Sequence, residues 1–221
     1  MDQKTVFAVL QKMHAVITDS HIVYTSGKHG SAYVNKDAVY PDVEEISRLC
    51  YQMALPFCIL ERMVDIVVGP AIGGVILSQR VAEHLGKMQG NKVQSIYAEK
   101  DGDGENFVVK RGYDRLLPEK QVLVVEDILT TGGTVKKVIE AVRRLGGNVI
   151  GVSAICNRGG VTSTDVGSVR TFSSLVNIQL AAWDENECPL CKAGQPINTD
   201  VGKGREFLMK RGIPDPSRFG A

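Results

Sequence analysis

The stretch "QVLVVEDILTTGGTVKKVIEAVRRLGG", residues 121–147, carries the pattern that decides the fold of this chain. A continuous apolar run leads to Glu126 and Asp127, and a short segment of hydroxyl and glycine residues follows. Beyond this segment, apolar side chains recur at helical spacing, at Val135, Val138, Ile139, Val142 and Leu145. We therefore predict a buried strand over 121–126, then a loop, then a helix over 134–145.

The same alternation of apolar strand and amphipathic helix extends to both sides of this stretch. Further strands are expected over 64–69, 92–99 and 148–156, and a helix is expected to follow the first of them and to end at Gly86. Strands that are apolar throughout are buried on both faces of a sheet. The pattern therefore predicts an α/β fold with a mainly parallel sheet flanked by helices.

The amino-terminal part of the chain is less regular. Helical spacing of apolar residues from Val6 to Ile17 predicts an opening helix. Residues 21–42 combine aromatic and turn-forming residues and are expected to form irregular strands and loops. Asp42 and Glu45 make a capping-box-like start for a second helix.

The remaining segments give weaker signals. Residues 99–115, with three glycines and mixed charges, are expected to form a long loop. Residues 173–183 can form another strand, and the tail from residue 184 has the composition of turns and a short helix.

Composition and charge exclude several classes of protein. The 221 residues suffice for one large α/β domain, and a formal net charge of +1 gives no global attraction to nucleic acid or to anionic lipid. The longest apolar stretch, 64–77, contains Asp65, Pro70 and three glycines, so no membrane span is expected. The start of the chain does not resemble a secretory signal, and five irregularly spaced cysteines argue against a secreted disulfide scaffold. We expect a cytoplasmic protein.

The segment after the 121–126 strand has the chemistry of a site for a sugar phosphate. In open parallel sheets, ligands bind beyond the carboxyl ends of the strands, and a helix amino terminus attracts an anion. The donors expected to hold a phosphate are Thr130, Thr131, Gly132, Gly133 and Thr134. Glu126 and Asp127 suit hydroxyl groups or a metal. A ribose 5-phosphate carries both kinds of group.

Two other phosphate-binding patterns are missing. The nucleoside-triphosphate loop requires G-x-x-x-x-G-K-[ST], and no such string occurs in the chain. The dinucleotide fingerprint G-x-G-x-x-G does not occur at the ends of the expected strands. A simple capped turn between strand and helix would need neither the paired acids nor so many hydroxyl groups.

One motif of this chain resembles that by which type I phosphoribosyltransferases bind 5-phosphoribosyl 1-pyrophosphate (PRPP). It consists of an apolar strand, then Glu-Asp, and then Thr-Thr-Gly-Gly-Thr. Other stretches extend the resemblance. "GPAIGGVILS" (69–78) is similar to the pyrophosphate loop of this family. "HIVYTSGKHGSAYVN" (21–35) resembles the amino-terminal segment of the orotate phosphoribosyltransferases, and "YAEKDGDGENFVVKRGYD" (97–114) takes the place of their mobile catalytic loop. "CPLCKAGQPI" (188–197) resembles the tail of a bacterial subgroup.

The resemblance implies the fold and the reaction. It implies a type I phosphoribosyltransferase fold in a single domain over 1–221, with a small amino-terminal hood (1–60), a PRPP-binding core (61–158) and a carboxyl-terminal strand and tail (159–221). The implied reaction transfers the phosphoribosyl group of PRPP to orotate and releases pyrophosphate. Mg²⁺ is expected to be held through the substrate without a dedicated protein cage. A homodimer is also implied.

The resemblance also implies roles for individual residues. Glu126 and Asp127 would hold the ribose hydroxyls and favour positive charge on the ring, and Lys100 would offset the charge of the leaving pyrophosphate. Lys110 and Arg111 are second candidates for that cation, in a loop over 101–112 that closes as a lid. The backbone of the pyrophosphate loop would contribute through Ala71, Ile72, Gly73 and Gly74. The base would be met by Arg158, Ser26, Lys28 and Tyr33.

Three positions depart from the usual pattern of the orotate enzymes. Thr25 and Gly73 stand where a basic residue and a lysine are common, and "KDGDGENF" (100–107) has acids where a second lysine and a histidine are usual. Lys28 and His29 would restore some positive charge near the base. Two alternatives therefore stay open, a phosphoribosyltransferase for purines or other bases and a regulator that senses PRPP or a nucleotide without catalysis.

The remaining cysteines and histidines give no clear site. Cys188 and Cys191 have the spacing of a zinc-binding pair, but a structural zinc needs four ligands and the chain has no second cysteine pair. Added histidines could take the place of a second pair, and pooling of pairs by two subunits would favour metal binding. His14 and His84 fall on expected helices and are interpreted as structural, whereas His21 and His29 lack a motif that fixes a role. Cys50, Cys58 and Cys156 are interpreted as core residues.

Overall fold

The computed structural model describes residues 1–59 and 63–213. The chain forms two compact units, which we call the sheet unit (residues 1–7 and 40–178) and the small unit (residues 8–39 and 179–221). The end of the tail, residues 214–221, lies outside the described residues, as does the expected boundary at residue 60.

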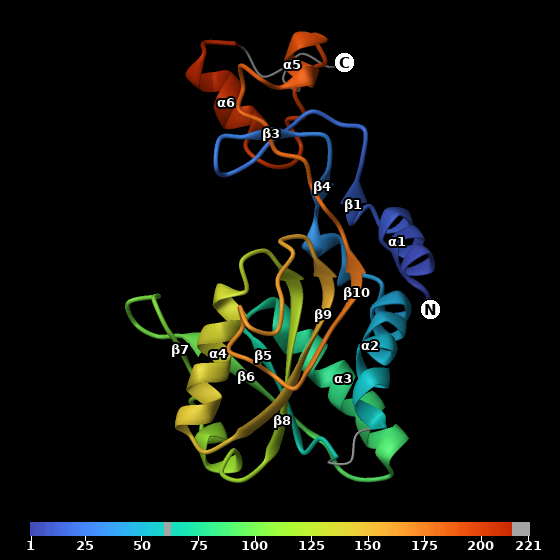
Figure 1. The fold of residues 1–221 in the computed structure, drawn as a ribbon, viewed down its shortest axis with the longest axis vertical. Helices are drawn as coiled ribbons and strands as arrows, with labels where there is room; N and C mark the ends of the chain where they lie inside the picture. Colours follow the sequence, from blue (N-terminus) through green and yellow to red (C-terminus); the bar gives the residue numbers. More distant parts are fainter. Residues whose placement is uncertain (60–62, 214–221) are drawn as a thin grey trace. The chain divides into compact units, whose positions relative to one another are not determined.

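The sheet unit is built on six strands in the order β10-β9-β8-β5-β6-β7 (Figure 1). The strands are β5 (Ile66–Pro70), β6 (Gln94–Lys100), β7 (Phe107–Val108), β8 (Gln121–Leu129), β9 (Asn148–Asn157) and β10 (Thr171–Asn177). Every neighbouring pair is parallel except β6 and β7, which form an antiparallel hairpin. The predicted mainly parallel sheet is confirmed.

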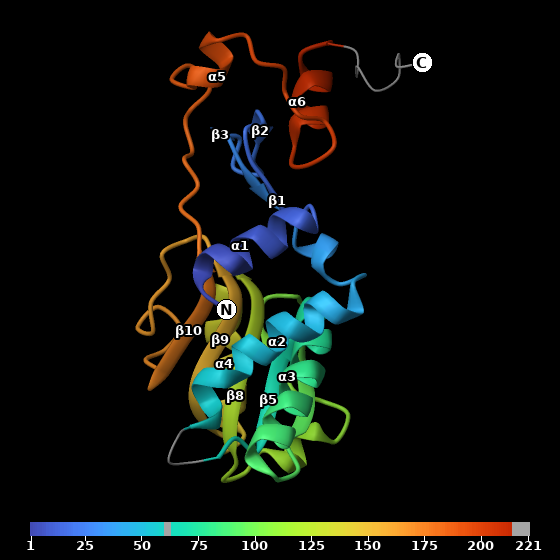
Figure 2. The ribbon, with the colours of Figure 1, turned by 90° about the vertical axis from the view of Figure 1, so that its right-hand side faces the viewer.

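Helices cover both faces of this sheet. They are α2 (Val43–Cys58), α3 (Gly73–Gln89) and α4 (Gly133–Arg144), with a 3-10 turn η2 (Tyr113–Leu116) before β8. Figures 1 and 2 show α2 and α3 side by side on one face and α4 on the other. Asp42 caps α2 as predicted, because its carboxylate accepts a hydrogen bond of 3.0 Å from the Glu45 N–H.

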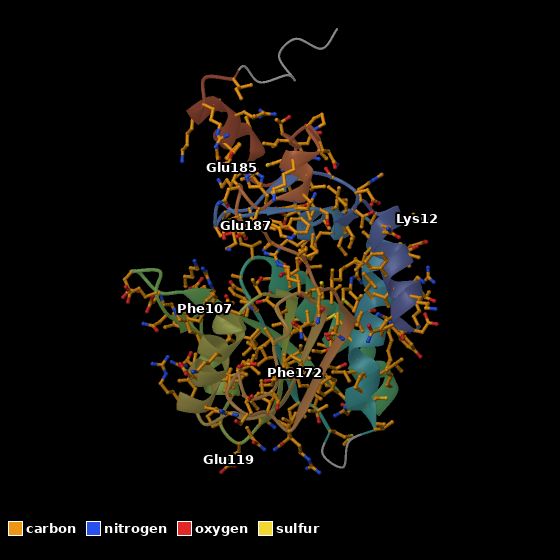
Figure 3. The ribbon with its side chains drawn as sticks, turned by 45° about the horizontal axis from the view of Figure 1, so that its top comes forward. Lys12, Phe107, Glu119, Phe172, Glu185 and Glu187 are labelled. Carbon is orange, nitrogen blue, oxygen red and sulfur yellow. The ribbon has the colours of Figure 1, made fainter. Side chains whose placement is uncertain are left out.

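Apolar side chains fill the space between the sheet and each helical layer. Val135, Val138 and Val142 of α4 are buried against strand residues such as Val124 and Val152. The cluster reaches both edge strands, through Phe107 of β7 and the partly buried Phe172 of β10, which Figure 3 labels. The helical spacing read from 134–145 therefore marks the face that packs on the sheet.

Gly151 of β9 lies directly under Phe57 of α2. A Cβ atom at this glycine would lie 2.4 Å from Phe57 Cε1 and 2.6 Å from the Thr171 carbonyl oxygen. Even a methyl group would displace the phenyl ring or the neighbouring strand. Glycine is therefore required at position 151 by the close packing of Phe57 and the neighbouring strand, and not by its backbone conformation.

We expect Gly151→Ala to destabilise the protein by about 1–3 kcal/mol, because overpacking of a filled core forces such shifts. For a chain of this size that lowers Tm by about 2–4 °C per kcal/mol. Calorimetry checks the value. Gly102→Ala is the control, because a Cβ there would meet no atom within 4 Å. An equal Tm for the two variants would contradict the packing argument.

Several details of the expected secondary structure are wrong. β8 continues to Leu129 because its last residues pair with Cys156 and Asn157 of β9. α3 passes Gly86 and ends at Gly90, which has a φ of 69°. The long loop contains the strand β7. The opening helix α1 (Gln3–Lys12) stops before His14, so that residue is not helical.

The small unit contains little regular structure. Its strands pair two by two, β1 (Val16–Ile17) with β4 (Tyr33–Val34) and β2 (Ile22–Val23) with β3 (His29–Gly30). Its short helices are η1 (Lys36–Val39), α5 (Pro189–Lys192) and α6 (Gly204–Lys210). Irregular structure was predicted for 21–42 and for the tail, and this is confirmed over the described residues.

Across residues 1–59 and 63–213, no helix is both long enough and apolar enough to cross a membrane.

Candidate active site

The pairing between strands β5 and β8 stops before their carboxyl ends. Their ladder runs from Ile66 opposite Val122 to Val68 opposite Val124 and goes no further. Beyond this point β5 pairs with β6 alone, and β8 pairs with β9. From β5 the chain continues to β6 on one side, and from β8 it continues to β9 on the other. The carboxyl ends of β5 and β8 therefore form the switch point at which ligands bind in open α/β sheets.

Glu126 and Asp127 lie just past this point on β8, and they face different loops. Successive side chains of a strand point to opposite faces. Glu126 lines a small open hollow together with the loop after β8. The Asp127 carboxylate instead lies against Gly73, because a Cβ at that glycine would be 2.4 Å from Asp127 Oδ2.

Both carboxylates are held in place although they are almost fully buried. Their exposed fractions are 7% for Glu126 and 5% for Asp127. Asp127 Oδ2 accepts a hydrogen bond of 2.9 Å from the Tyr40 hydroxyl, and Oδ1 accepts one of 2.7 Å from the Ile128 N–H. Glu126 Oε1 accepts one of 3.0 Å from the Asp127 N–H. Burying two acids is costly unless they serve a ligand or are fully hydrogen-bonded.

The loop from Thr130 to Gly133 and the first turn of α4 form the rest of the hollow. Gly132 has a φ of 76°, a backbone angle that residues with a side chain rarely adopt, and it leads the chain into α4. The Thr131 hydroxyl accepts a bond of 3.3 Å from the Gly133 N–H. Thr130 and Thr134 are exposed at the rim. The structure thus brings together all five residues predicted to hold a phosphate.

The loop after β5 lies beside the two acids. It contains a cis peptide bond between Ala71 and Ile72, and the Ala71 N–H donates to the Ala98 carbonyl at 2.7 Å. Gly74 packs onto the chain at Gly69, since a Cβ at Gly74 would lie 2.8 Å from Gly69 Cα. The N–H groups of Gly73 and Gly74 open α3, and the first N–H groups of a helix have no intrahelical acceptor. They are the backbone donors of this loop that suit an anion.

The three candidate cations lie on or after the β6–β7 hairpin. Lys100 is the last residue of β6 and is exposed. Arg111 Nη2 lies 3.2 Å from Glu99 Oε2, and this carboxylate raises the pKa of the guanidinium. Lys110 is exposed on the segment after β7. Among the described residues, no ion pair of Lys100 is found, and its role as the catalytic cation stays a prediction.

The turn of this hairpin is ordered by its own acids. The Asp101 carboxylate accepts from the Asn106 N–H at 3.1 Å, and the Asp103 carboxylate accepts from the Glu105 N–H at 2.9 Å. Lys137 of α4 also donates to the Glu105 carbonyl oxygen. These contacts hold the turn against α4 inside the sheet unit. Closure of 101–112 as a lid stays a prediction.

The residues predicted to meet the base divide between the two units. Arg158 follows β9 in the sheet unit, where its Nε donates to the Thr130 hydroxyl at 3.2 Å. In the small unit, the Lys28 ammonium pairs with Asp184 Oδ2 at 3.0 Å, and Ser26 Oγ accepts from the Lys28 N–H at 3.4 Å. Tyr33 lies on β4 and is half-buried. Their role in binding a base stays a prediction.

Tyr40 is a residue of this site that the sequence did not reveal. It lies well upstream of Asp127, in a stretch whose residues had been interpreted only as strands and loops. In the sequence, Tyr40 is recognisable only as a tyrosine just before Asp42, the residue that caps α2. This position does not by itself indicate a hydrogen-bond partner on β8.

Comparison with known proteins agrees with this geometry. Residues 31–187 match the model of the phosphoribosyl transferase domain, more than half of the chain. The chain therefore belongs to the phosphoribosyltransferase family. It is 38% identical over 200 residues to a protein of Caldanaerobacter subterraneus subsp. tengcongensis named orotate phosphoribosyltransferase, covering 89% of this chain and 96% of the relative. A protein of the same name from Thermotoga maritima is 38% identical over 205 residues, covering 89% and 97%.

Solved structures show the same fold at lower identity. The orotate phosphoribosyltransferase of Aeropyrum pernix superposes with a TM-score of 0.60 at 24% identity, covering 77% of this chain and 92% of the other. That of Mycobacterium tuberculosis, crystallised with PRPP, gives 0.59 at 17% identity, covering 80% and 97%. An adenine phosphoribosyltransferase of Thermoanaerobacter pseudethanolicus also gives 0.59, at 19% identity, covering 78% and 99%. The fold alone therefore does not select the base.

Proposed function

We propose that this chain is an orotate phosphoribosyltransferase, which transfers the phosphoribosyl group of PRPP to orotate and forms orotidine 5′-phosphate and pyrophosphate. The observation that carries the proposal is the 38% identity, over nearly the whole chain, to relatives named orotate phosphoribosyltransferase. The arrangement at the carboxyl ends of β5 and β8 supports it. The loops that follow these two strands, together with Glu126 and Asp127, suit a phosphorylated sugar that carries a second anionic group.

The proposed reaction breaks the bond between ribose C1 and the pyrophosphate oxygen, and a ring nitrogen of orotate bonds to the same carbon. Positive charge develops on the ring and negative charge on the leaving group. Catalysis then depends on positioning and on electrostatic stabilisation. Residues 130–134 bind the 5-phosphate, with the hydroxyls at the rim of the hollow and the helix dipole of α4 behind it.

In the proposed complex, Glu126 lies beside the loop after β8 and Asp127 lies beside the loop after β5. Glu126 faces the phosphate hollow and Asp127 faces Gly73, so a ribose between the loops meets a carboxylate on each side. Both acids accept hydrogen bonds from ribose hydroxyls and favour the positive ring of the transition state. Gly73 and Gly74 donate N–H groups to the pyrophosphate, and Lys100 offsets its charge as the bond breaks.

The donor set suits Mg²⁺ held mainly through PRPP. This ion takes oxygen ligands, keeps several waters and is commonly bound through one or two carboxylates plus substrate phosphates. Glu126 offers such a carboxylate in the hollow, and Asp127 offers one beside Gly73. An ion held there would supply positive charge that offsets the negative charge of the pyrophosphate.

We further propose that the enzyme serves pyrimidine synthesis in the cytoplasm as a homodimer. The cysteines Cys50, Cys58, Cys156, Cys188 and Cys191 form no disulfide, which is usual in a reducing compartment. Arg158 is proposed to bind the orotate carboxylate, since a guanidinium fits a planar carboxylate in bidentate fashion. Ser26, Lys28 and Tyr33 are proposed to complete the base site.

The test mixes the protein with PRPP, Mg²⁺ and one base at a time and measures release of pyrophosphate. We expect turnover with orotate and none with adenine, guanine or hypoxanthine. Turnover with a purine alone would select the first alternative. Tight PRPP binding without release of pyrophosphate for any base would select a sensor.

A further inference from the structure

The small unit brings together two histidines and two cysteines that lie far apart in the sequence. His21 directly precedes β2 and His29 is the first residue of β3, whereas Cys188 directly precedes α5 and Cys191 lies within it. One ligand atom from each side chain lies within 4.8 Å of the other three. The exposed fractions of His21, His29 and Cys188 are 2%, 0% and 0%, and Cys191 is half-buried.

The distances match a tetrahedral ligand set. Zinc bonds to sulfur and to imidazole nitrogen at lengths that place the ligand atoms of a tetrahedron about 3.3–3.8 Å apart. Cys188 Sγ and Cys191 Sγ lie 3.7 and 3.5 Å from His21 Nε2, and Cys191 Sγ lies 3.3 Å from His29 Nδ1. The two nitrogens are slightly closer, at 2.9 Å.

Hydrogen bonding alone does not account for this arrangement. His21 Nδ1 lies 2.7 Å from the Gln195 carbonyl oxygen, which only accepts, so Nδ1 carries the proton and Nε2 keeps a lone pair. Three possible donors surround that one lone pair, and it can accept from only one of them. A cation at the centre would satisfy all four ligand atoms at once. The bond to Gln195 is also the outer contact that fixes the tautomer of a metal-bound histidine.

We infer that His21, His29, Cys188 and Cys191 form a closed structural zinc site. Two thiolates with two imidazoles in a tetrahedral set select Zn²⁺ over harder ions, and four protein ligands leave no open position for a substrate. The CPLC pair finds its two missing partners within the same chain.

The site joins residues 8–39 to the carboxyl-terminal segment of the small unit, a segment that has few buried apolar side chains. Among the described residues from 179 onward, Cys188 is the one buried apolar side chain. The backbone contacts include two isolated bridges made by the histidine ligands themselves, His21 with Ile197 and His29 with Trp183, and a hydrogen bond of 2.7 Å from the Lys203 N–H to the Val23 carbonyl oxygen. Glu185, labelled in Figure 3, pairs with Arg211 at the end of α6. A zinc ion would therefore reinforce these contacts between residues 8–39 and the carboxyl-terminal segment at a mostly buried point.

The test begins with metal analysis of the wild-type chain purified from zinc-supplied cells. We expect about one zinc per chain by mass spectrometry, in line with a closed four-ligand site. Replacement by Co²⁺ should give the thiolate charge-transfer band and the intense ligand-field bands of tetrahedral cobalt. Cys191→Ser should lose the zinc and lower Tm. Cys58→Ser, at a half-buried thiol of α2 in the sheet unit, should retain it.

Several results would overturn the inference. The first is a wild-type chain that contains no zinc and gives no cobalt–thiolate spectrum. The second is full zinc retention in Cys191→Ser. The third is half a zinc per chain, which would mean a site shared by two subunits. A disulfide between Cys188 and Cys191 in thiol titration would do the same. Metal analysis and cobalt spectra of the wild type need no variant, so misfolding of Cys191→Ser leaves the test intact.

Discussion

Asp127→Asn is expected to lower kcat/KM for PRPP by about 100- to 1,000-fold, the range seen when one electrostatic contact to a transition state is removed. The asparagine keeps the size of the side chain and one carbonyl oxygen, but it loses the negative charge beside Gly73 and an acceptor for Tyr40 or for Ile128. PRPP affinity should fall as well, because the same carboxylate is proposed to bind a ribose hydroxyl. Steady-state kinetics and calorimetric titration with PRPP measure the two effects.

Two other variants separate charge from position. Tyr40→Phe keeps the carboxylate charge and removes one hydrogen bond, so it should cost about 1 kcal/mol, or about fivefold in kcat/KM. Glu140→Gln, on an exposed position of α4, should change neither value. Asp127→Asn should also leave Tm unchanged or raised, because it removes a buried charge. An unchanged PRPP affinity in Asp127→Asn would refute the assignment to ribose.

The sequence around 121–147 predicted strand, loop and helix because each is set by local rules. Apolar periodicity fixed the buried face of α4, and the hydroxyl and glycine run marked the loop. The end of β8 is different. Ile128 and Leu129 stay in the strand because their backbone pairs with β9, and no local pattern encodes which strand will lie alongside. For the same reason the opposite orientation of Glu126 and Asp127 emerged only from the structure.

The contacts that sequence reasoning missed all join residues far apart in the chain. Tyr40 meets Asp127, and His21 meets Cys191, across separations that local spacing cannot report. A signal for the second case did exist. Four histidines were available to complete the CPLC pair, and the two set aside as helical left only His21 and His29. His84 indeed lies on α3, where its Nε2 is 3.0 Å from Ser47 Oγ.

Lys100→Ala is expected to lower kcat by about 100-fold, the low end of the loss found when one such stabilising group is removed. Its ammonium is proposed to act on charge that appears as the bond to pyrophosphate breaks, so PRPP affinity should change by only about threefold. Lys100 ends β6 at the edge of the sheet where the β5 and β8 loops lie, whereas Arg111 is already paired with Glu99. Arg111→Ala should therefore have the smaller effect on kcat.

Lys92→Ala is the matched control, since Lys92 is an exposed lysine just before the other end of β6. Single-turnover kinetics with saturating PRPP isolate the chemical step from product release. If Lys100→Ala reduces affinity and turnover by the same factor, the lysine binds the ground state and transition state alike. A larger loss of kcat in Lys110→Ala than in Lys100→Ala would instead transfer the role to the segment after β7. The comparison decides which cation lies opposite the leaving group, because only that cation gains interaction energy as negative charge builds up.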